Sequence, residues 1–302
     1  MKKTEVGSVA LLFLAALIWG VAFVAQSMGM EYVGPFTFNG CRFLLGGFVL
    51  TPVALLREQK YRKSQKFHNL SVTEKKKHIT VTILGGVCCG IAIFVASSFQ
   101  QVGMQYTSVG KAGFITALYI VLVPILGIFL KKKVAPVVWM GVVLGAIGSY
   151  FLCMTESFTI NSGDLLIFAC AVCFSFHIMI IDYFAPKADG VALSCLQFWF
   201  SGIVSMIIAL VTESMDVSSI LQAAGPILYA GIMSCGVAYT LQILGQKRMN
   251  PAIASLILSC ESVVSVLAGW LILQEVMTKR QLLGCVLVFG AVILAQIPSR
   301  NE

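Results

Sequence analysis

Residues 108–130 read SVGKAGFITALYIVLVPILGIFL, and this stretch decides the fold class. It contains a single charged side chain, Lys111, and is otherwise almost entirely apolar. An α-helix needs about 20 mostly apolar residues to cross the hydrocarbon core of a bilayer. The stretch therefore predicts a transmembrane helix and not a helix of a soluble core.

The rest of the chain repeats this pattern. Of the 302 residues, 58% are hydrophobic and 11% are charged, whereas a soluble domain carries about 25% charged residues. We therefore expect an all-α integral membrane protein, multi-pass in the cell membrane. Ten transmembrane helices are predicted, at 108–130 and at 7–27, 34–56, 79–101, 134–153, 163–184, 189–212, 221–246, 251–273 and 280–297. The first run follows Lys2-Lys3 like a signal peptide, but it exceeds the usual h-region, so we interpret it as the first helix.

The basic residues set the expected topology. With a cytoplasmic N-terminus, seventeen Lys and Arg fall in inner segments, eight of them in the predicted loop 57–78, against only Lys279 and Arg280 outside. Because positive charge marks cytoplasmic loops, both termini are predicted to be cytoplasmic. The same distribution accounts for the net charge of +8. We therefore expect the lipid bilayer, and no nucleic acid, as a partner.

The sequence also shows a weak internal repeat. A shift of 155 residues places Arg42 on Gln197, and a shift of 143 places Gly141 on Gly284. Each half holds five predicted spans, and an odd number makes the halves enter the membrane from opposite sides. Inverted repeats of this kind are typical of secondary transporters. We expect two inverted five-helix repeats around a central cavity, at 1–156 and 157–302.

The ten cysteines indicate small apolar packing groups, because all lie inside or at the ends of apolar runs. Cys170 and Cys173 are three residues apart, but no nearby His or Cys pair completes a zinc site. Nucleotide-binding, protease, hydrolase and DNA-binding motifs are lacking. We expect no metal, no cofactor and no enzyme activity.

Several short motifs stand in or next to the predicted spans. They are Leu17-Ile18-Trp19-Gly20 and Arg42, then Lys111-Ala112-Gly113-Phe114 through Pro124, and finally Cys260-Glu261-Ser262, Gln274-Glu275 and Gln281-Leu282-Leu283-Gly284. These motifs resemble EamA-type members of the drug/metabolite transporter superfamily. Two positions depart from the family pattern: Ser262 stands where a proline is common, and Gln274 where a glycine is common. The resemblance implies ten helices in two inverted repeats, with a central cavity open alternately to each side.

Ionisable residues inside the spans are the main candidates for a site, since each costs about 2.5–3.5 kcal/mol at mid-helix. Arg42 can bind an anionic group, or it can be a structural tie to carbonyls. Lys111 can contact substrate, neutralise Glu261, or snorkel to the interface. Glu261 can bind a proton or a substrate amine, or it can belong to a buried structural pair. We predict that Lys111 and Glu261 approach one another in at least one transport state.

Other polar and aromatic groups have weaker signals. His177 can titrate near neutrality, but a lone histidine on an apolar helix is more often a satisfied core group. Aromatic rings and amides, including Gln101 and Gln242, can line a pocket or serve helix packing. The expected substrate-binding set is Trp19, Arg42, Lys111, Tyr119, His177, Tyr239 and Glu261.

Together these features predict a secondary transporter. It moves a small organic metabolite or drug by alternating access, driven by a gradient or by exchange because ATP-binding motifs are lacking. A passive facilitator is the alternative within transport. An intramembrane enzyme using Glu261 and His177 as acid and base is the alternative from another class. These features are also compatible with assembly of the chain as a homodimer.

Overall fold

The computed structural model describes residues 3–107, 109–153, 161–272 and 277–295, and within these ranges it is helical, without strands. The first half contains α1 (Lys3–Gly29), α2 (Pro35–Arg62), α3 (Gln65–His68), α4 (Val72–Gly103), α5 (Val109–Ala117), α6 (Tyr119–Phe129) and α7 (Pro136–Cys153). The second half contains α8 (Ser162–Phe184), α9 (Gly190–Thr212), α10 (Val217–Gln222), α11 (Ala224–Leu228), the π-helix η1 (Tyr229–Ala238), α12 (Tyr239–Gln246), α13 (Pro251–Leu258), α14 (Cys260–Ile272) and α15 (Lys279–Ala295).

Within the described residues, helix covers nearly all of each predicted span, which confirms the all-α class. Among the described residues, eight helical stretches are long and apolar enough to cross a bilayer, and Pro136–Leu152 is a shorter apolar helix. The last helix, α15, has 17 described residues. The count of ten crossings therefore stays a prediction, as does the inverted orientation of the halves.

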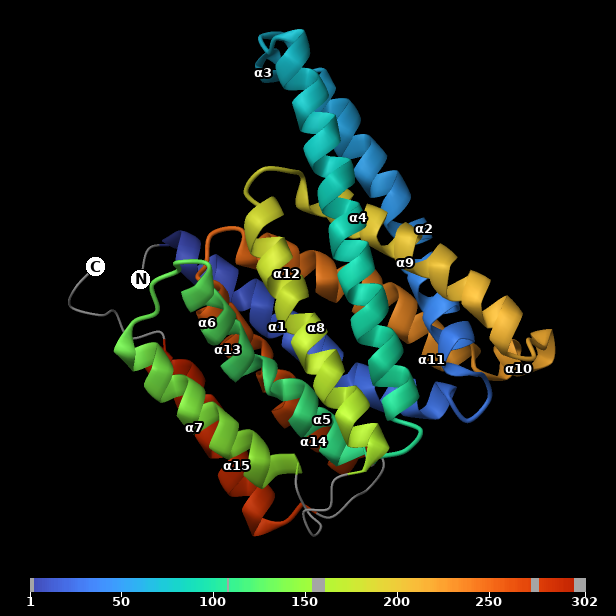
Figure 1. Cartoon of the computed structure of the whole chain (residues 1–302), viewed down its shortest axis with the longest axis vertical. Coiled ribbons are helices and arrows are strands. Elements are labelled where there is room, and N and C mark those ends of the chain that lie inside the picture. Colours follow the sequence, from blue (N-terminus) through green and yellow to red (C-terminus); the bar gives the residue numbers. More distant parts are fainter. Residues whose placement is uncertain (1–2, 108, 154–160, 273–276, 296–302) are drawn as a thin grey trace.

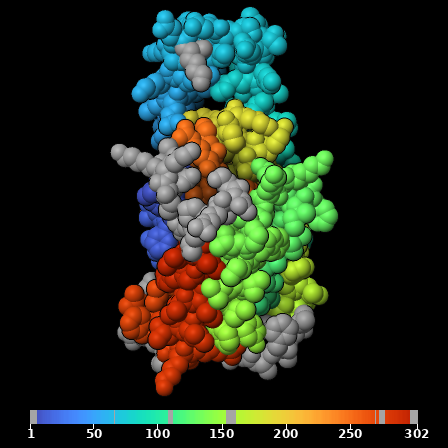
Figure 2. Space-filling view, turned by 90° about the vertical axis from the view of Figure 1, so that its left-hand side faces the viewer, coloured from blue at the N-terminus to red at the C-terminus, as the bar shows by residue number. Residues whose placement is uncertain are grey.

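Helices of the first half pack in pairs against helices of the second half (Figure 1). α2 packs along α9, α4 along α8 and α9, and α7 along α15, so each pair takes one helix from each half. Figure 2 shows α7 and α15 side by side on one face of the molecule. Glycine permits the closest of these approaches: a Cβ at Gly284 would lie 2.7 Å from the carbonyl oxygen of Gly148. Small residues at such crossings are the usual means of close helix packing in membranes.

Two spans are broken near their middle. α5 gives way to α6 at Leu118, and α13 gives way to α14 at Ser259. Near the second break, serine hydroxyls compete for backbone carbonyls: Ser259 Oγ donates to Leu256 O at 2.7 Å, and Ser262 Oγ donates to Ser259 O at 2.7 Å. Serine back-bonding of this kind bends helices. Ser262, which stands where the family commonly has proline, thus lies at a distorted turn.

The basic segment 57–78 corrects one prediction. It was expected to be a loop, but α2 continues to Arg62 and α4 begins at Val72, so most of it is helical. Ser71 and Glu74 form a reciprocal capping box that starts α4 before its apolar part. The end of α2, α3 and the start of α4 project beyond the bundle as a hairpin arm (Figure 1).

Candidate functional site

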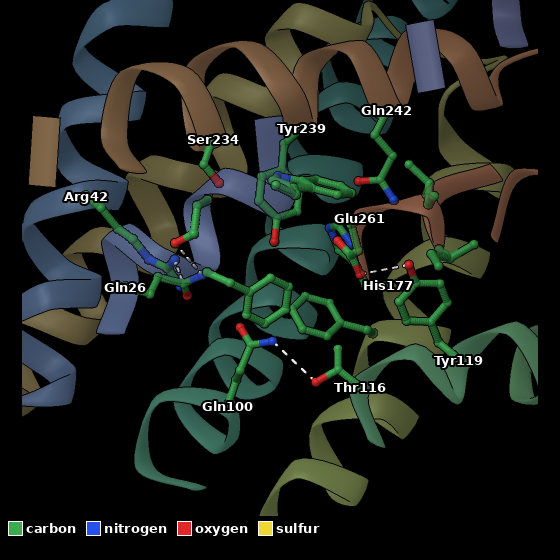
Figure 3. A pocket seen from close by; sticks show the side chains of 16 residues that line it. Gln26, Arg42, Gln100, Thr116, Tyr119, His177, Ser234, Tyr239, Gln242 and Glu261 are labelled. Atoms are coloured by element: carbon green, nitrogen blue, oxygen red, sulfur yellow. Dashed lines mark hydrogen bonds between the residues drawn. The ribbon is translucent and has the colours of Figure 1, made fainter. Parts of the chain in front are cut away.

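A central cavity of about 50 Å³ lies where the helices of both halves meet (Figure 3). A buried water needs roughly 10–15 Å³ of such space, so the cavity has room for only a few waters. Its walls come from α1, α2, α4, α5, α6, α8, η1, α12, α13 and α14. The lining side chains are Trp19, Ala22, Phe23, Gln26, Arg42, Gln100, Thr116, Tyr119, Phe174, His177, Ile178, Ser234, Tyr239, Gln242, Leu258 and Glu261.

Arg42 forms one polar end of the cavity. Its Nη1 donates to Gln26 Oε1 at 2.8 Å, and its guanidinium carbon lies 4.8 Å from the ring centroid of Phe43. The side chain is only 4% exposed, and within the described part of the chain it forms no ion pair. Arg42 Nε finds no hydrogen-bond partner there either. A buried cation with an unused donor favours an anionic or strongly accepting group beside it.

Glu261 forms a second polar end, in the first turn of α14. Tyr119, the first residue after the break in the other span, donates from its hydroxyl to Glu261 Oε1 at 2.9 Å. α1 can approach this turn because position 20 is glycine. A Cβ there would lie 2.5 Å from Val264 Cβ and 2.8 Å from the carbonyl oxygen of Glu261.

Aromatic rings separate the two polar ends. Tyr239 lies 4.5 Å from Trp19 and 6.0 Å from His177, measured between ring centroids. Tyr239 directly follows η1, a π-helical segment of ten residues, and π-helical turns occur frequently at functional sites. Trp19 Nε1 and Gln242 Oε1 have no hydrogen-bond partner among the described residues. The wall therefore offers flat apolar surface and two unused polar atoms.

The structure brings together six of the seven predicted site residues. Lys111 is the exception: its backbone belongs to α5, but its side chain lies outside the described residues, so its predicted approach to Glu261 stays a prediction. Gln242 lines the cavity, whereas Gln101 is buried elsewhere. Whether these side chains bind a substrate is likewise a prediction.

Sequence reasoning missed other polar groups in the cavity wall. These are Gln26, Gln100, Thr116 and Ser234, which are almost fully buried. Gln100 Nε2 and Thr116 Oγ1 lie 3.5 Å apart, at the limit of a hydrogen bond. The sequence signal for these four residues was an amide or hydroxyl side chain inside an apolar span. Such side chains also occur in the spans at positions outside the cavity wall, so this signal does not single out the cavity residues.

His177 is engaged by a neighbour. Its Nε2 lies 3.0 Å from Gln197 Oε1, and in the described part of the chain no hydrogen bond joins it to Glu261. Within the same part no group of three or more His, Cys, Asp and Glu is placed to hold a metal ion. The arrangement offers hydrogen bonding and charge around a small space.

A multi-pass helical bundle with two broken spans around a polar cavity has the architecture of a membrane transporter. The model of the EamA-like transporter family matches residues 7–154 and again residues 161–296, so the chain belongs to this family. It carries two copies of the family's unit.

Relatives agree with this assignment. An uncharacterized transporter of Archaeoglobus fulgidus is 29% identical over 95% of this chain and 84% of its own length. The uncharacterized transporter YoaV of Bacillus subtilis is 22% identical over 90% of each chain. Protein PecM of Dickeya dadantii is 25% identical over 71% of this chain and 72% of its own. A solved crystal structure with 20% identity superimposes with a TM-score of 0.75 over 96% of each chain, which shows a shared fold.

Proposed function

We propose that the chain is a secondary transporter that moves a small organic molecule through the central cavity by alternating access, coupled to a gradient or to exchange. One observation carries this proposal: the Tyr119–Glu261 hydrogen bond joins two broken spans, one from each half, at the cavity wall. Discontinuous helices at a midplane site are typical of secondary transporters. Rocking of one half against the other would make or break such a bond.

The polarity of the cavity supports a class of substrate. An anionic group fits beside Arg42, whose Nε lacks a partner among the described residues. A flat apolar body fits against Trp19 and Tyr239. A protonated amine, or a coupling proton, fits at Glu261. We propose a small organic molecule with a negative group at one end and a planar or apolar body.

The size of the cavity supports a contracted state. Pockets for drug-sized ligands measure about 300–1,000 Å³, far more than the about 50 Å³ found here. Substrate entry therefore requires helices to separate. The breaks at Leu118 and Ser259 and the π-helical segment are the places where the spans can bend. We further propose that the halves are inverted five-span repeats in the cell membrane, with both termini cytoplasmic.

The alternatives differ in what they predict for exchange. A passive facilitator equilibrates its substrate but is not stimulated by substrate on the opposite side, and an enzyme changes the compound chemically. The test uses proteoliposomes preloaded with isotope-labelled small metabolites and diluted either into the same unlabelled mixture or into buffer alone, and mass spectrometry of the lumen then shows which losses of label depend on outside substrate. We expect one class of compound to exchange unaltered in wild type.

Two variants test the part that Glu261 takes in this exchange. Glu261→Gln should lose the exchange, and Glu31→Gln, which replaces an exposed carboxylate, should keep it. Chemical conversion of the compound would contradict the proposal.

A further inference from the structure

A second cavity lies at the end of the bundle that carries the hairpin arm. It has a volume of about 530 Å³ and lies between the end of α2, the start of α4, the α8–α9 turn and the end of α12. Four cationic side chains line it, against two carboxylates, Glu58 and Asp189. The cations are Arg57, Lys60, Lys187 and Lys247. We call this cavity the basic basin.

Both carboxylates of the basic basin are already engaged. Asp189 accepts the backbone N–H groups of Val191 and Ala192 through Oδ1 and the guanidinium of Arg57 through Oδ2, at 2.7–3.1 Å. Burial opposes the ionisation of Asp189, but these hydrogen bonds outweigh it and hold its pKa below the ordinary value. Glu58 Oε1 accepts from Arg62 Nε at 2.7 Å, and its other oxygen lies 3.8 Å from His78.

The three lysines of the basin are therefore left with unneutralised charge. Among the described residues, Lys60 and Lys247 form no ion pair. Lys187 Nζ lies over the ring of Tyr183, 3.0 Å from its centroid, and has no carboxylate partner in that part of the chain. Three elements, α2, the α8–α9 turn and the end of α12, thus direct positive charge at one space.

An apolar groove continues from the basin between α2, α4 and α9. Its volume is about 340 Å³, and it shares Ala54, Glu58, His78 and Ala192 with the basin wall. Deeper along the spans its lining becomes aliphatic and aromatic, with Leu55, Ile79, Ile83, Leu196 and Trp199. Leu55 is 58% exposed and Ile83 is 51% exposed, so the groove opens sideways onto the surface that the acyl chains contact.

We propose that the basic basin and its groove form a binding site for one anionic phospholipid. The phosphate and headgroup occupy the basin beside Lys60, Lys187 and Lys247, and one acyl chain follows the groove past Ile83 and Trp199. Charge complementarity and the continuity of the two cavities both support this occupant, because a free anion would leave the groove unused and a neutral lipid would leave the lysines unpaired. The bound lipid would join helices from both halves at this end of the bundle.

The test compares thermal unfolding of the purified full-length protein in detergent with added phosphatidylglycerol, phosphatidylcholine or inorganic phosphate. We expect phosphatidylglycerol to raise the Tm by about 3 °C more than phosphatidylcholine, because a ligand of the folded state stabilises it. The combined variant Lys60→Gln, Lys187→Gln and Lys247→Gln should lose this difference. The matched variant Lys76→Gln, Lys131→Gln and Lys133→Gln removes the same charge from exposed positions outside the basin and should retain it.

Native mass spectrometry of the wild-type protein provides a second readout that needs no variant. One phosphatidylglycerol should remain bound at collision energies that strip phosphatidylcholine. Equal effects of the two lipids, or an undiminished preference in the basin variant, would overturn the proposal. Full reproduction of the phosphatidylglycerol effect by inorganic phosphate would also overturn it, since the groove would then have no role.

Discussion

The hydroxyl of Tyr119 lies 2.9 Å from Glu261 Oε1, although the two residues are 142 positions apart in the chain. Tyr119 begins α6 directly after the break at Leu118, and Glu261 is two residues past the break at Ser259. The hydrogen bond therefore links the interrupted spans of the two halves at the cavity wall. It satisfies a carboxylate that is 7% exposed, and it places that carboxylate beside the aromatic wall.

Removal of the Tyr119 hydroxyl tests this link. Tyr119→Phe keeps the ring but leaves the Glu261 carboxylate without its donor, and an unsatisfied buried group costs about 1–3 kcal/mol. We expect a lower Tm by thermal denaturation and at least about tenfold slower transport in proteoliposomes. Tyr32→Phe, at a 44% exposed position, is the control. Equal behaviour of the two variants would show that the hydrogen bond has no role.

Double-mutant cycles distinguish the two partners suggested for Glu261. Tyr119→Phe with Glu261→Gln should show a coupling energy of about 0.5–3 kcal/mol on unfolding, because the side chains are in contact. Lys111→Met with Glu261→Gln should be coupled in transport if the predicted ion pair forms in another state. Strict additivity of the second cycle, in both stability and transport, would mean that Lys111 and Glu261 never meet.

Arg42 should not be replaceable by lysine. A point charge cannot reproduce both the hydrogen bond to Gln26 and the contact of the planar guanidinium with the Phe43 ring. We expect Arg42→Lys to reduce transport at least about tenfold at normal expression. Arg62→Lys is the matched control, since Arg62 is an exposed partner of Glu58 outside the cavity. Full transport by Arg42→Leu would remove Arg42 from the site.

The topology can be tested with two new thiols at exposed positions. Each thiol is introduced into a cysteine-free variant of the protein, and intact cells that express it are treated with an impermeant maleimide. Lys63→Cys in the hairpin arm should resist labelling, and Ser218→Cys in α10 should react. Ser218 is chosen as the outer position in place of the nearby Glu213, because replacement of Glu213 would disturb α2. The Glu213 carboxylate accepts hydrogen bonds from Phe36 N and Thr37 N and thus caps that helix. Labelling of residue 63 with protection of residue 218 would reverse the assigned orientation.

The positions of the helices could be predicted from sequence because membrane spans are marked by long apolar runs such as 108–130. Six of the cavity residues could be predicted because a buried charge or ring in such a run needs an interior partner. The expectation that segment 57–78 is a loop was wrong. The segment was interpreted as a loop because it is highly charged, but Lys and Glu also have high helix propensity.

Other features left no usable signal in the sequence. Helices that are apolar on every side have no periodic face that points inward. Gln26, Gln100 and Thr116 were therefore missed as cavity residues. The two breaks lie at Leu118 and Ser259, which are neither glycine nor proline, so the usual helix-breaking residues do not mark them. The π-helical segment contains Gly231 and Gly236, but glycines are frequent in membrane helices and these two do not single it out.

Accessibility of one cavity position from both sides of the membrane tests the central claim most directly. Thr116 lines the cavity and is 2% exposed, whereas Ser205 on α9 is fully buried away from it. Thr116→Cys and Ser205→Cys are treated with a small impermeant thiosulfonate in right-side-out and inside-out vesicles, and the modification is read by mass spectrometry of each site. Alternating access predicts that Thr116→Cys reacts from either side and Ser205→Cys from neither. Reaction of Thr116→Cys from one side only, under all substrate conditions, would contradict the account.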